Sequence, residues 1–259
     1  MTAAALHPLA GTFRYEFRMQ IRRPALWALF AMASLLLLPS ISQWPNLPTR
    51  APAELAGSAT HHINTYLPII FGLLLADRLV RARRLNTLEL WESFPAGRGA
   101  RLWGTFLGAA SASLVPLVLI NLALVGLIAR AVGDAHVLAW ELPIFVLMVL
   151  PGLLFVGAFS IVCTLALPLP LYAILFIGYW FWGNVVQPSR IPTLTCTLLT
   201  PIGNNVAYGL LKLPGGPCLG VWPAATAAQS WESIGLLIGL ALCALAAGQI
   251  VLSWRAGQG

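Results

Sequence analysis

Residues Asp77–Arg101 read DRLVRARRLNTLELWESFPAGRGAR. This is the only long interior segment that is dense in charge, and an apolar run lies on each side of it. Membrane proteins gather Lys and Arg in their cytoplasmic loops, so a segment this rich in Arg predicts an inner loop between two membrane helices. It is also the best candidate for a surface on which another protein docks.

The composition places the whole chain in a membrane. Of its 259 residues, 59% are hydrophobic and only 9% are charged, and the mean hydropathy is +0.82. A soluble domain has nearer a quarter of its residues charged. We therefore expect one transmembrane domain over 1–259. The net charge of +7 reflects basic inner loops, so it does not indicate a nucleic-acid partner, and none is expected.

The apolar runs predict an all-α membrane protein with six transmembrane helices. A spanning helix needs about 20 mostly apolar residues. Between the fourth and fifth runs, Leu165–Pro170 contains two prolines, which cannot continue a helix, so a tight turn is expected there. A single broken helix is the alternative. The expected spans are 25–42, 63–80, 103–129, 141–166, 169–186 and 233–252.

Basic residues set the orientation. Six spans place both termini on one side, and with that side inside, eleven of the fifteen Lys and Arg residues lie on inner segments. The four on outer segments are Arg50, Arg130, Arg190 and Lys212. This bias predicts cytoplasmic N- and C-termini and a multi-pass protein of the cell's inner (cytoplasmic) membrane.

Two parallel rows precede the first span. Apolar residues recur every four positions at Phe13, Phe17 and Ile21. Basic residues recur with the same spacing at Arg14, Arg18 and Arg22. This pattern favours an amphipathic helix that lies on the inner membrane surface. The alternative is an ordinary basic flank of the first span.

The segment 187–232 is too long for a simple turn and too apolar for a water-exposed loop. Short helices that re-enter the outer leaflet fit better, provided that protein buries their backbone ends. Cys196 and Cys218 share this segment and can form a disulfide, which would stabilise it by roughly 3 kcal/mol. Two unpaired thiols are the alternative.

The inner loop contains a short predicted helix. Asn86 can cap it, Glu89 then stands at the third position of a capping box, and Pro95 ends it. Its apolar side combines aliphatic and aromatic side chains, and this suits either docking to a protein or resting on lipid headgroups. These apolar residues are Leu88, Leu90, Trp91 and Phe94.

Three further features concern packing and chemistry. Gly104, Gly108 and Ala112 form a small-residue stripe that lets helices approach closely. Asp77 is expected to pair with Arg78 and Arg81, and Glu141 is expected at an outer helix start, where a carboxylate suits the helix dipole. We expect no metal site, because the four histidines do not have ligand spacing. A P-loop is excluded, because its consensus sequence does not occur.

The chain resembles the permease subunits of ABC-2 type ABC transporters. The resemblance rests on the order of elements, on the stretch Leu85–Leu90 followed by Pro95, and on Leu199–Leu210 after the fifth span. It departs from the usual pattern at Arg81–Arg84, where a Gly-rich approach is more common. The resemblance implies a coupling helix at Asn86, Leu88, Glu89, Leu90, Trp91 and Phe94, and a re-entrant outer segment that includes Pro201, Asn204, Tyr208 and Gly209.

The same resemblance implies partners and an activity. Two separate ATPase subunits would supply ATP and Mg, and a second permease copy or a similar permease chain would complete the transporter within the membrane lipids. The cargo would be exported, and charge-poor spans favour a hydrophobic or amphipathic one. No catalytic residue is expected in this chain. The alternatives are a membrane enzyme acting on lipids and a non-transporting sensor or assembly subunit.

Overall fold

The computed structural model describes residues 3–42, 49–84, 97–186, 188–189, 191–214 and 224–256. Within these ranges the chain is helical and has no strand, so the expected all-α class is confirmed there. The predicted coupling helix at 86–95 lies outside the described residues. The helices are α1 (Ala3–Ile21), α2 (Pro24–Ser42), α3 (Pro52–Arg84), α5 (Arg98–Val132), α6 (His136–Ile144), η2 (Phe145–Val149), α7 (Leu150–Ala166), α8 (Leu169–Asn184), η3 (Val206–Leu210) and α9 (Ala227–Ala256).

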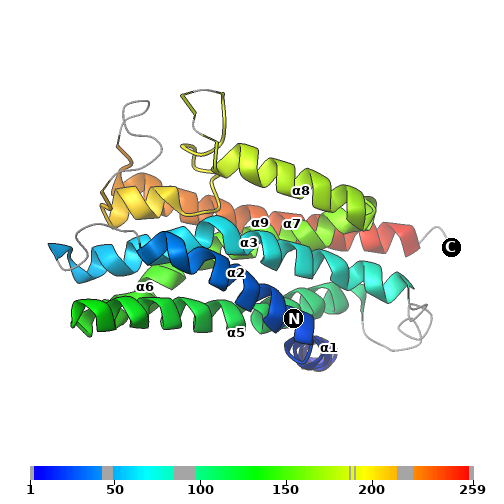
Figure 1. Cartoon of the computed structure of the whole chain (residues 1–259). Coiled ribbons are helices and arrows are strands. Elements are labelled where there is room, and N and C mark those ends of the chain that lie inside the picture. The colour runs from blue at the N-terminus through cyan, green and yellow to red at the C-terminus, as the bar shows by residue number, and fades with distance from the viewer. Residues whose placement is uncertain are drawn as a thin grey trace.

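The long helices form an elongated bundle with a crossing helix at one end. In Figure 1 the axes of α3, α5, α7, α8 and α9 run along the bundle, whereas α1 is seen end-on and lies across it. The C-terminal ends of α3 and α9 and the N-terminal end of α5 lie at the same end of the bundle. We call this the basic end, because α3 and α5 meet the Arg-rich segment there.

Each predicted span falls on a helix, although the boundaries differ. Three helices in the described part of the chain are long and apolar enough to cross a membrane: Gly99–Val132, His136–Ala166 and Ala227–Trp254. A shorter apolar helix covers Pro24–Leu35. The fifth predicted span is α8, whose 16 residues extend about 24 Å, which is less than the ~30 Å hydrocarbon core of a bilayer.

Proline explains the irregular fourth span. The helix runs from His136 to Ala166 but contains a π-helical turn, η2, immediately before Pro151. Proline lacks the N–H that would bond to the preceding turn, and its ring crowds the carbonyl there, so the helix widens by one residue instead of breaking. After Ala166 the predicted turn is present, since Leu167 and Pro168 are extended and α8 starts at Leu169.

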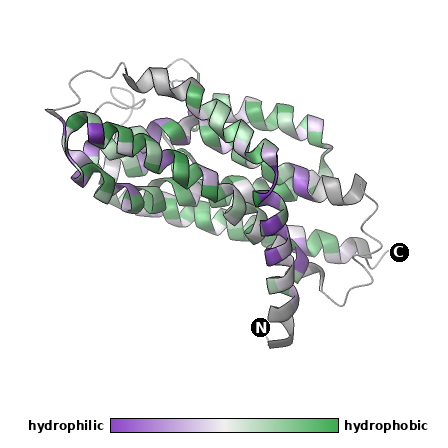
Figure 2. Ribbon diagram, turned by 60° about the horizontal axis from the view of Figure 1, so that its bottom comes forward, coloured by the Kyte–Doolittle hydropathy of each residue, from purple (hydrophilic) through white to green (hydrophobic). Residues whose placement is uncertain are grey.

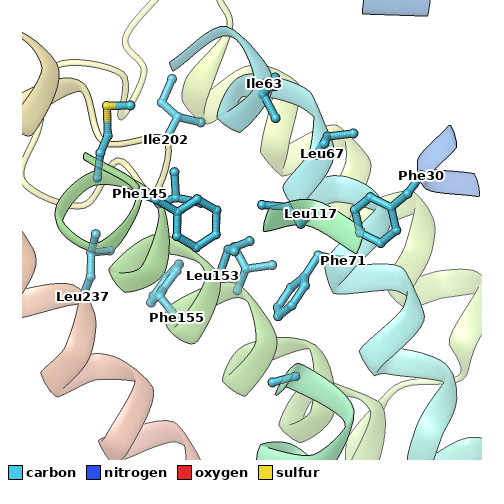
Figure 3. Close-up of a cluster of buried hydrophobic side chains, with 14 of the residues drawn as sticks. Phe30, Ile63, Leu67, Phe71, Leu117, Phe145, Leu153, Phe155, Ile202 and Leu237 are labelled. Atoms are coloured by element: carbon cyan, nitrogen blue, oxygen red, sulfur yellow. The ribbon is translucent and has the colours of Figure 1, made fainter. Parts of the chain in front are cut away.

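The core of the bundle is apolar and built from α3, α5 and the α6–α7 helix. Phe71, Leu117 and Leu153 are each about 1% exposed, and aromatic rings fill the space between the helices (Figure 3). Trp180 of α8 is fully buried, and its indole N–H donates to the Thr65 carbonyl at 2.8 Å, which attaches α8 to α3. The bundle is held by the packing of apolar side chains between helices.

The outside of the bundle is apolar as well. Ile174 of α8 is 70% exposed and Ile250 of α9 is 67% exposed. Figure 2 shows hydrophobic residues over most of the long helices and hydrophilic residues along α1. Apolar patches of this extent face lipid or another protein. The chain is therefore a helical membrane protein, as its composition predicts.

Glycines set the crossing of α1 over α5. A Cβ added to Gly104 would lie 2.7 Å from Cβ of Thr12, and one added to Gly108 would lie 2.6 Å from the Phe13 carbonyl oxygen. Side chains at these positions would push the two helices apart. The predicted small-residue stripe of α5 thus marks the place where the N-terminal helix packs.

Candidate functional site: the charge network and the 191–214 segment

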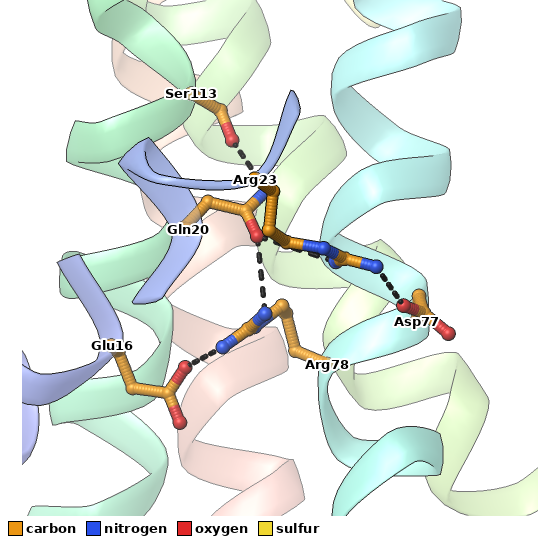
Figure 4. Close-up of polar contacts among 6 residues, drawn as sticks. All are labelled: Glu16, Gln20, Arg23, Asp77, Arg78 and Ser113. Atoms are coloured by element: carbon orange, nitrogen blue, oxygen red, sulfur yellow. Dashed lines mark hydrogen bonds and ion pairs between the residues drawn. The ribbon is translucent and has the colours of Figure 1, made fainter. Parts of the chain in front are cut away.

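A network of polar side chains connects α1, α3 and α5 near the basic end (Figure 4). We call the following residues the charge network: Glu16, Gln20, Arg23, Asp77, Arg78 and Ser113. Arg78 of α3 donates to the Glu16 carboxylate of α1 and, at 3.1 Å, to Oε1 of Gln20. The Gln20 amide in turn donates to the Ser113 hydroxyl of α5 at 3.2 Å.

Arg23 closes the network on its exposed side. Its guanidinium lies 3.1 Å from the Asp77 carboxylate and 3.4 Å from Oε1 of Gln20. The expectation that Asp77 pairs with Arg78 is wrong, because neighbouring helical residues point in directions about 100° apart. The Arg81 side chain, the other expected partner, lies outside the described residues. Arg78 points inward to α1, whereas Asp77 faces the start of α2.

The network is buried where α1 meets the bundle. Gln20 and Ser113 are fully buried, Arg78 is 4% exposed and Glu16 is 6% exposed. Removing charges from water is costly unless each is paired and hydrogen-bonded. Here the Arg78 guanidinium bonds both to the Glu16 carboxylate and to Gln20, so the network holds α1 in one position relative to α3. Sequence reasoning missed it, although Thr12, Glu16 and Gln20 recur every four residues as a polar stripe.

The helix predicted for the membrane surface, with Phe13, Arg14, Phe17, Arg18 and Ile21, is α1. The structure turns its polar stripe toward the bundle, leaves Phe13, Phe17 and Ile21 half-buried, and exposes Arg14 and Arg18. The apolar row therefore flanks the α5 contact. The position of α1 at a membrane surface stays a prediction.

At the opposite end of the bundle, the 191–214 segment inserts between helices. A Cβ on Gly152 of α7 would collide with the Pro201 carbonyl, and one on Gly203, whose φ is +80°, would collide with Met148. The Asn64 amide of α3 donates to the Ile202 carbonyl at 3.0 Å. Backbone thus packs directly on α7 and α3, which only glycine at these two positions allows.

The asparagines of this segment hold its own backbone. Asn204 donates to the Thr195 carbonyl at 2.7 Å, and Asn205 donates to the Thr197 carbonyl at 3.0 Å. Gly209 packs against the first turn of α9, where Ser230 donates to the Asn205 carbonyl. These amides and hydroxyls satisfy buried backbone groups, as a segment enclosed by apolar helices requires.

A hollow of about 310 Å³ opens beside this segment. Its lining includes Ser58, His61 and Tyr66 of α3 and Tyr208 of the segment. His61 Nε2 lies 2.8 Å from Oδ1 of Asn204, and the His61 and Tyr208 rings meet edge to face at 5.6 Å. Burial lowers the pKa of His61, so its imidazole is neutral at pH 7 and donates from Nε2 to the amide oxygen.

Glu141 is not at a helix start. The helix begins at His136, so Glu141 lies in its second turn, where it is 2% exposed and accepts a hydrogen bond from Thr60 at 2.9 Å. The expectation that Glu141 lies at an outer helix start, where its carboxylate would suit the helix dipole, is therefore wrong. Its carboxyl group joins α6 to α3, as Arg78 joins α3 to α1.

Other predicted site residues fall outside the described residues. They are Asn86, Leu88, Glu89, Leu90, Trp91 and Phe94, together with Cys218. Cys196 is disulfide-bonded, whereas Cys163 and Cys243 are free thiols. The pairing of Cys196 with Cys218 stays a prediction. In the described part of the chain, no cluster of three or more His, Cys, Asp or Glu side chains could hold a metal ion.

Comparison with protein-family models and with curated proteins finds no match to this chain.

Proposed function

We propose that this protein is the permease subunit of an ATP-driven ABC-2 type transporter and that it exports a hydrophobic or amphipathic cargo. The observation that carries the proposal is the arrangement of elements along the bundle. A crossing N-terminal helix, the junction of α3 with α5 and the end of α9 share one end, and the inserted 191–214 segment lies at the other. This matches the layout on which the sequence resemblance rests.

The proposal assigns six spans and cytoplasmic termini. The spans lie within α2, α3, α5, the α6–α7 helix, α8 and α9, and α3 crosses at about 63–80. The basic end faces the cytoplasm, and the protein lies in the inner membrane of the cell. Two ATPase subunits, each with ATP and Mg, dock on the 86–95 helices of a permease dimer. The partner permease is a second copy or a similar chain.

The charge network supports this assignment physically. The predicted docking helix follows α3 directly, and α3 carries Arg78 into the network. A force on the inner end of α3 is therefore transmitted to α1 and α5 through buried, hydrogen-bonded charges rather than through flexible surface contacts. A subunit that converts ATPase closure into movement of its helices needs a stiff connection of this kind.

The membrane-enzyme alternative receives less support from the described residues. It needs acid–base groups on the predicted outer segment 187–232. In its described part, the candidate polar groups Asn204 and Asn205 donate hydrogen bonds to backbone carbonyls. Asn184, close by, accepts from Thr200. The sensor or assembly alternative shares the docking helix and differs only in cargo movement.

A photo-crosslinking amino acid at position 91 tests the docking assignment. When it replaces Trp91 in the full chain in native membranes, illumination should link the chain to a protein that carries a P-loop. The matched control is the same replacement at Trp231, an exposed tryptophan at the opposite end, which should not. Equal crosslinking from both positions, or no P-loop protein from position 91, would contradict the proposal.

A further inference from the structure

The face of α1 that points away from the bundle carries Arg14 and Arg18, and Arg22 follows in the turn directly after the helix. Thr12, Glu16 and Gln20 are buried, whereas Arg14, Arg18 and Arg22 are exposed. Residues four apart lie one above another on a helix, with neighbouring Cβ atoms roughly 6 Å apart. Three guanidinium groups therefore project side by side from the surface opposite the charge network.

These three arginines have no acidic partner in the described part of the chain. The one acid of α1, Glu16, is buried and bonded to Arg78, and the half-buried Asp77 of α3 is bonded to Arg23 (Figure 4). Like charges four residues apart destabilise a helix by roughly 0.2–0.5 kcal/mol per pair. An anion from outside the chain would remove this repulsion.

A hollow of about 530 Å³ runs along the row. Its lining combines the three guanidinium groups with apolar and aromatic side chains, namely Gly11, Arg14, Tyr15, Arg18, Met19 and Arg22. At Gly11 nothing lies within 4 Å of where a Cβ would stand, so this end is open. Such a lining suits a ligand with a phosphate at one end and hydrocarbon at the other.

The position of the row indicates where this ligand comes from. The last arginine of the row lies two residues before the apolar helix α2, which begins at Pro24. Trp27, in the first turn of α2, is 40% exposed, and its indole N–H donates to the Ile21 carbonyl at 2.8 Å. A half-exposed tryptophan at the start of an apolar helix is typical of the membrane–water interface. We therefore expect the row to lie at headgroup level.

We propose that Arg14, Arg18 and Arg22 form a binding site for anionic phospholipids, with their guanidinium groups on the lipid phosphates. The proposal does not depend on the ATPase or on cargo. Phosphatidylglycerol and phosphatidylcholine both carry a phosphate, but only phosphatidylglycerol has a net negative charge, so we expect it to bind more tightly. Each arginine near an anionic surface strengthens binding about fivefold, so the row as a whole strengthens it by about two orders of magnitude.

The test uses the purified full-length protein in a neutral detergent. Native mass spectrometry measures the bound fraction during titration with phosphatidylglycerol and, separately, with phosphatidylcholine. The test variant is R14Q/R18Q/R22Q, and the matched control is R130Q, which removes an exposed arginine from the other end of the bundle. Inorganic phosphate, added as a competitor, separates a lipid site from a soluble-anion site.

The expected result is a preference for phosphatidylglycerol that R130Q keeps and R14Q/R18Q/R22Q loses. A triple variant R14K/R18K/R22K should keep most of it, and the single variant R18Q should lose about fivefold, even if the triple Gln variant folds poorly. The proposal is overturned if R18Q and R130Q behave alike, if the Lys variant loses the preference, or if inorganic phosphate displaces the lipid at equal concentration.

Discussion

Glu16→Leu should destabilise the protein by about 3–5 kcal/mol, because it leaves the Arg78 guanidinium buried without its partner. The side chains of Arg78 and Glu16 are 1% and 8% exposed, so water cannot replace the lost carboxylate. Gln20 alone, at 3.1 Å, supplies a neutral acceptor. This cost is a large fraction of the stability of a typical domain.

The double variant Glu16→Leu/Arg78→Met should recover most of that loss. It replaces the ion pair with apolar side chains of similar length, and such replacements are often neutral or stabilising. The less buried pair Arg50–Glu54, with side chains 27% and 26% exposed, provides the control. Its Glu54→Leu variant should cost less than about 1 kcal/mol.

Equilibrium unfolding with sodium dodecyl sulfate in mixed micelles, followed by tryptophan fluorescence, measures five proteins: the wild type, Glu16→Leu, Arg78→Met, the double variant and Glu54→Leu. The double-mutant cycle then gives the coupling energy between Glu16 and Arg78, expected to be at least about 2 kcal/mol. If Glu16→Leu costs no more than Glu54→Leu, the network behaves as a surface contact and does not stabilise the position of α1.

Three further changes test other parts of the structure. Gly152→Ala should lower the free energy of unfolding by at least about 2 kcal/mol, because the new methyl group collides with the Pro201 carbonyl; Gly178→Ala, in open space, should not. Burial lowers the pKa of His61 below its ordinary value of about 6.5. As the pH falls below that value, the unfolded chain binds a proton at His61 that the folded chain does not bind, so the melting temperature should fall. The His61→Gln variant should show a smaller change of melting temperature with pH. Trp91→Ala should reduce ATPase association and transport in vesicles while the melting temperature stays unchanged; unchanged association and transport would contradict the docking assignment.

The helices could be predicted from the sequence, because apolar runs of about 20 residues have few alternatives in a membrane. The turn at Leu167 and Pro168 could also be predicted, since two prolines in six residues end a helix. The exact ends of the helices were harder to predict. The last helix starts at Ala227, before the expected 233, because Thr226 and Gln229 cap it with reciprocal hydrogen bonds. Its first turn is polar, so it does not belong to the apolar run from which the span was predicted, although polar residues are compatible with a helix.

The buried polar contacts could not be predicted in this way. Pairing of Arg78 with Glu16 joins residues 62 positions apart, and only the crossing of α1 over Gly104 and Gly108 brings them together. Asp77 is adjacent to Arg78 in sequence, which favoured the wrong partner. The close approach of the Pro201 backbone to Gly152 could not be predicted either, because a glycine in an apolar helix can have many packing roles. Long-range contacts between helices depend on crossing geometry, which periodicity does not contain.

The most direct test of the account is gentle purification of the full chain from its native membrane, followed by mass identification and quantification of what co-elutes. We predict a P-loop ATPase in a one-to-one ratio with the proposed permease chains, retained by the Trp231→Ala variant and lost when Trp91 and Phe94 are both replaced with Ala. A chain that elutes without a nucleotide-binding partner, or an ATPase that both variants retain equally, would contradict it.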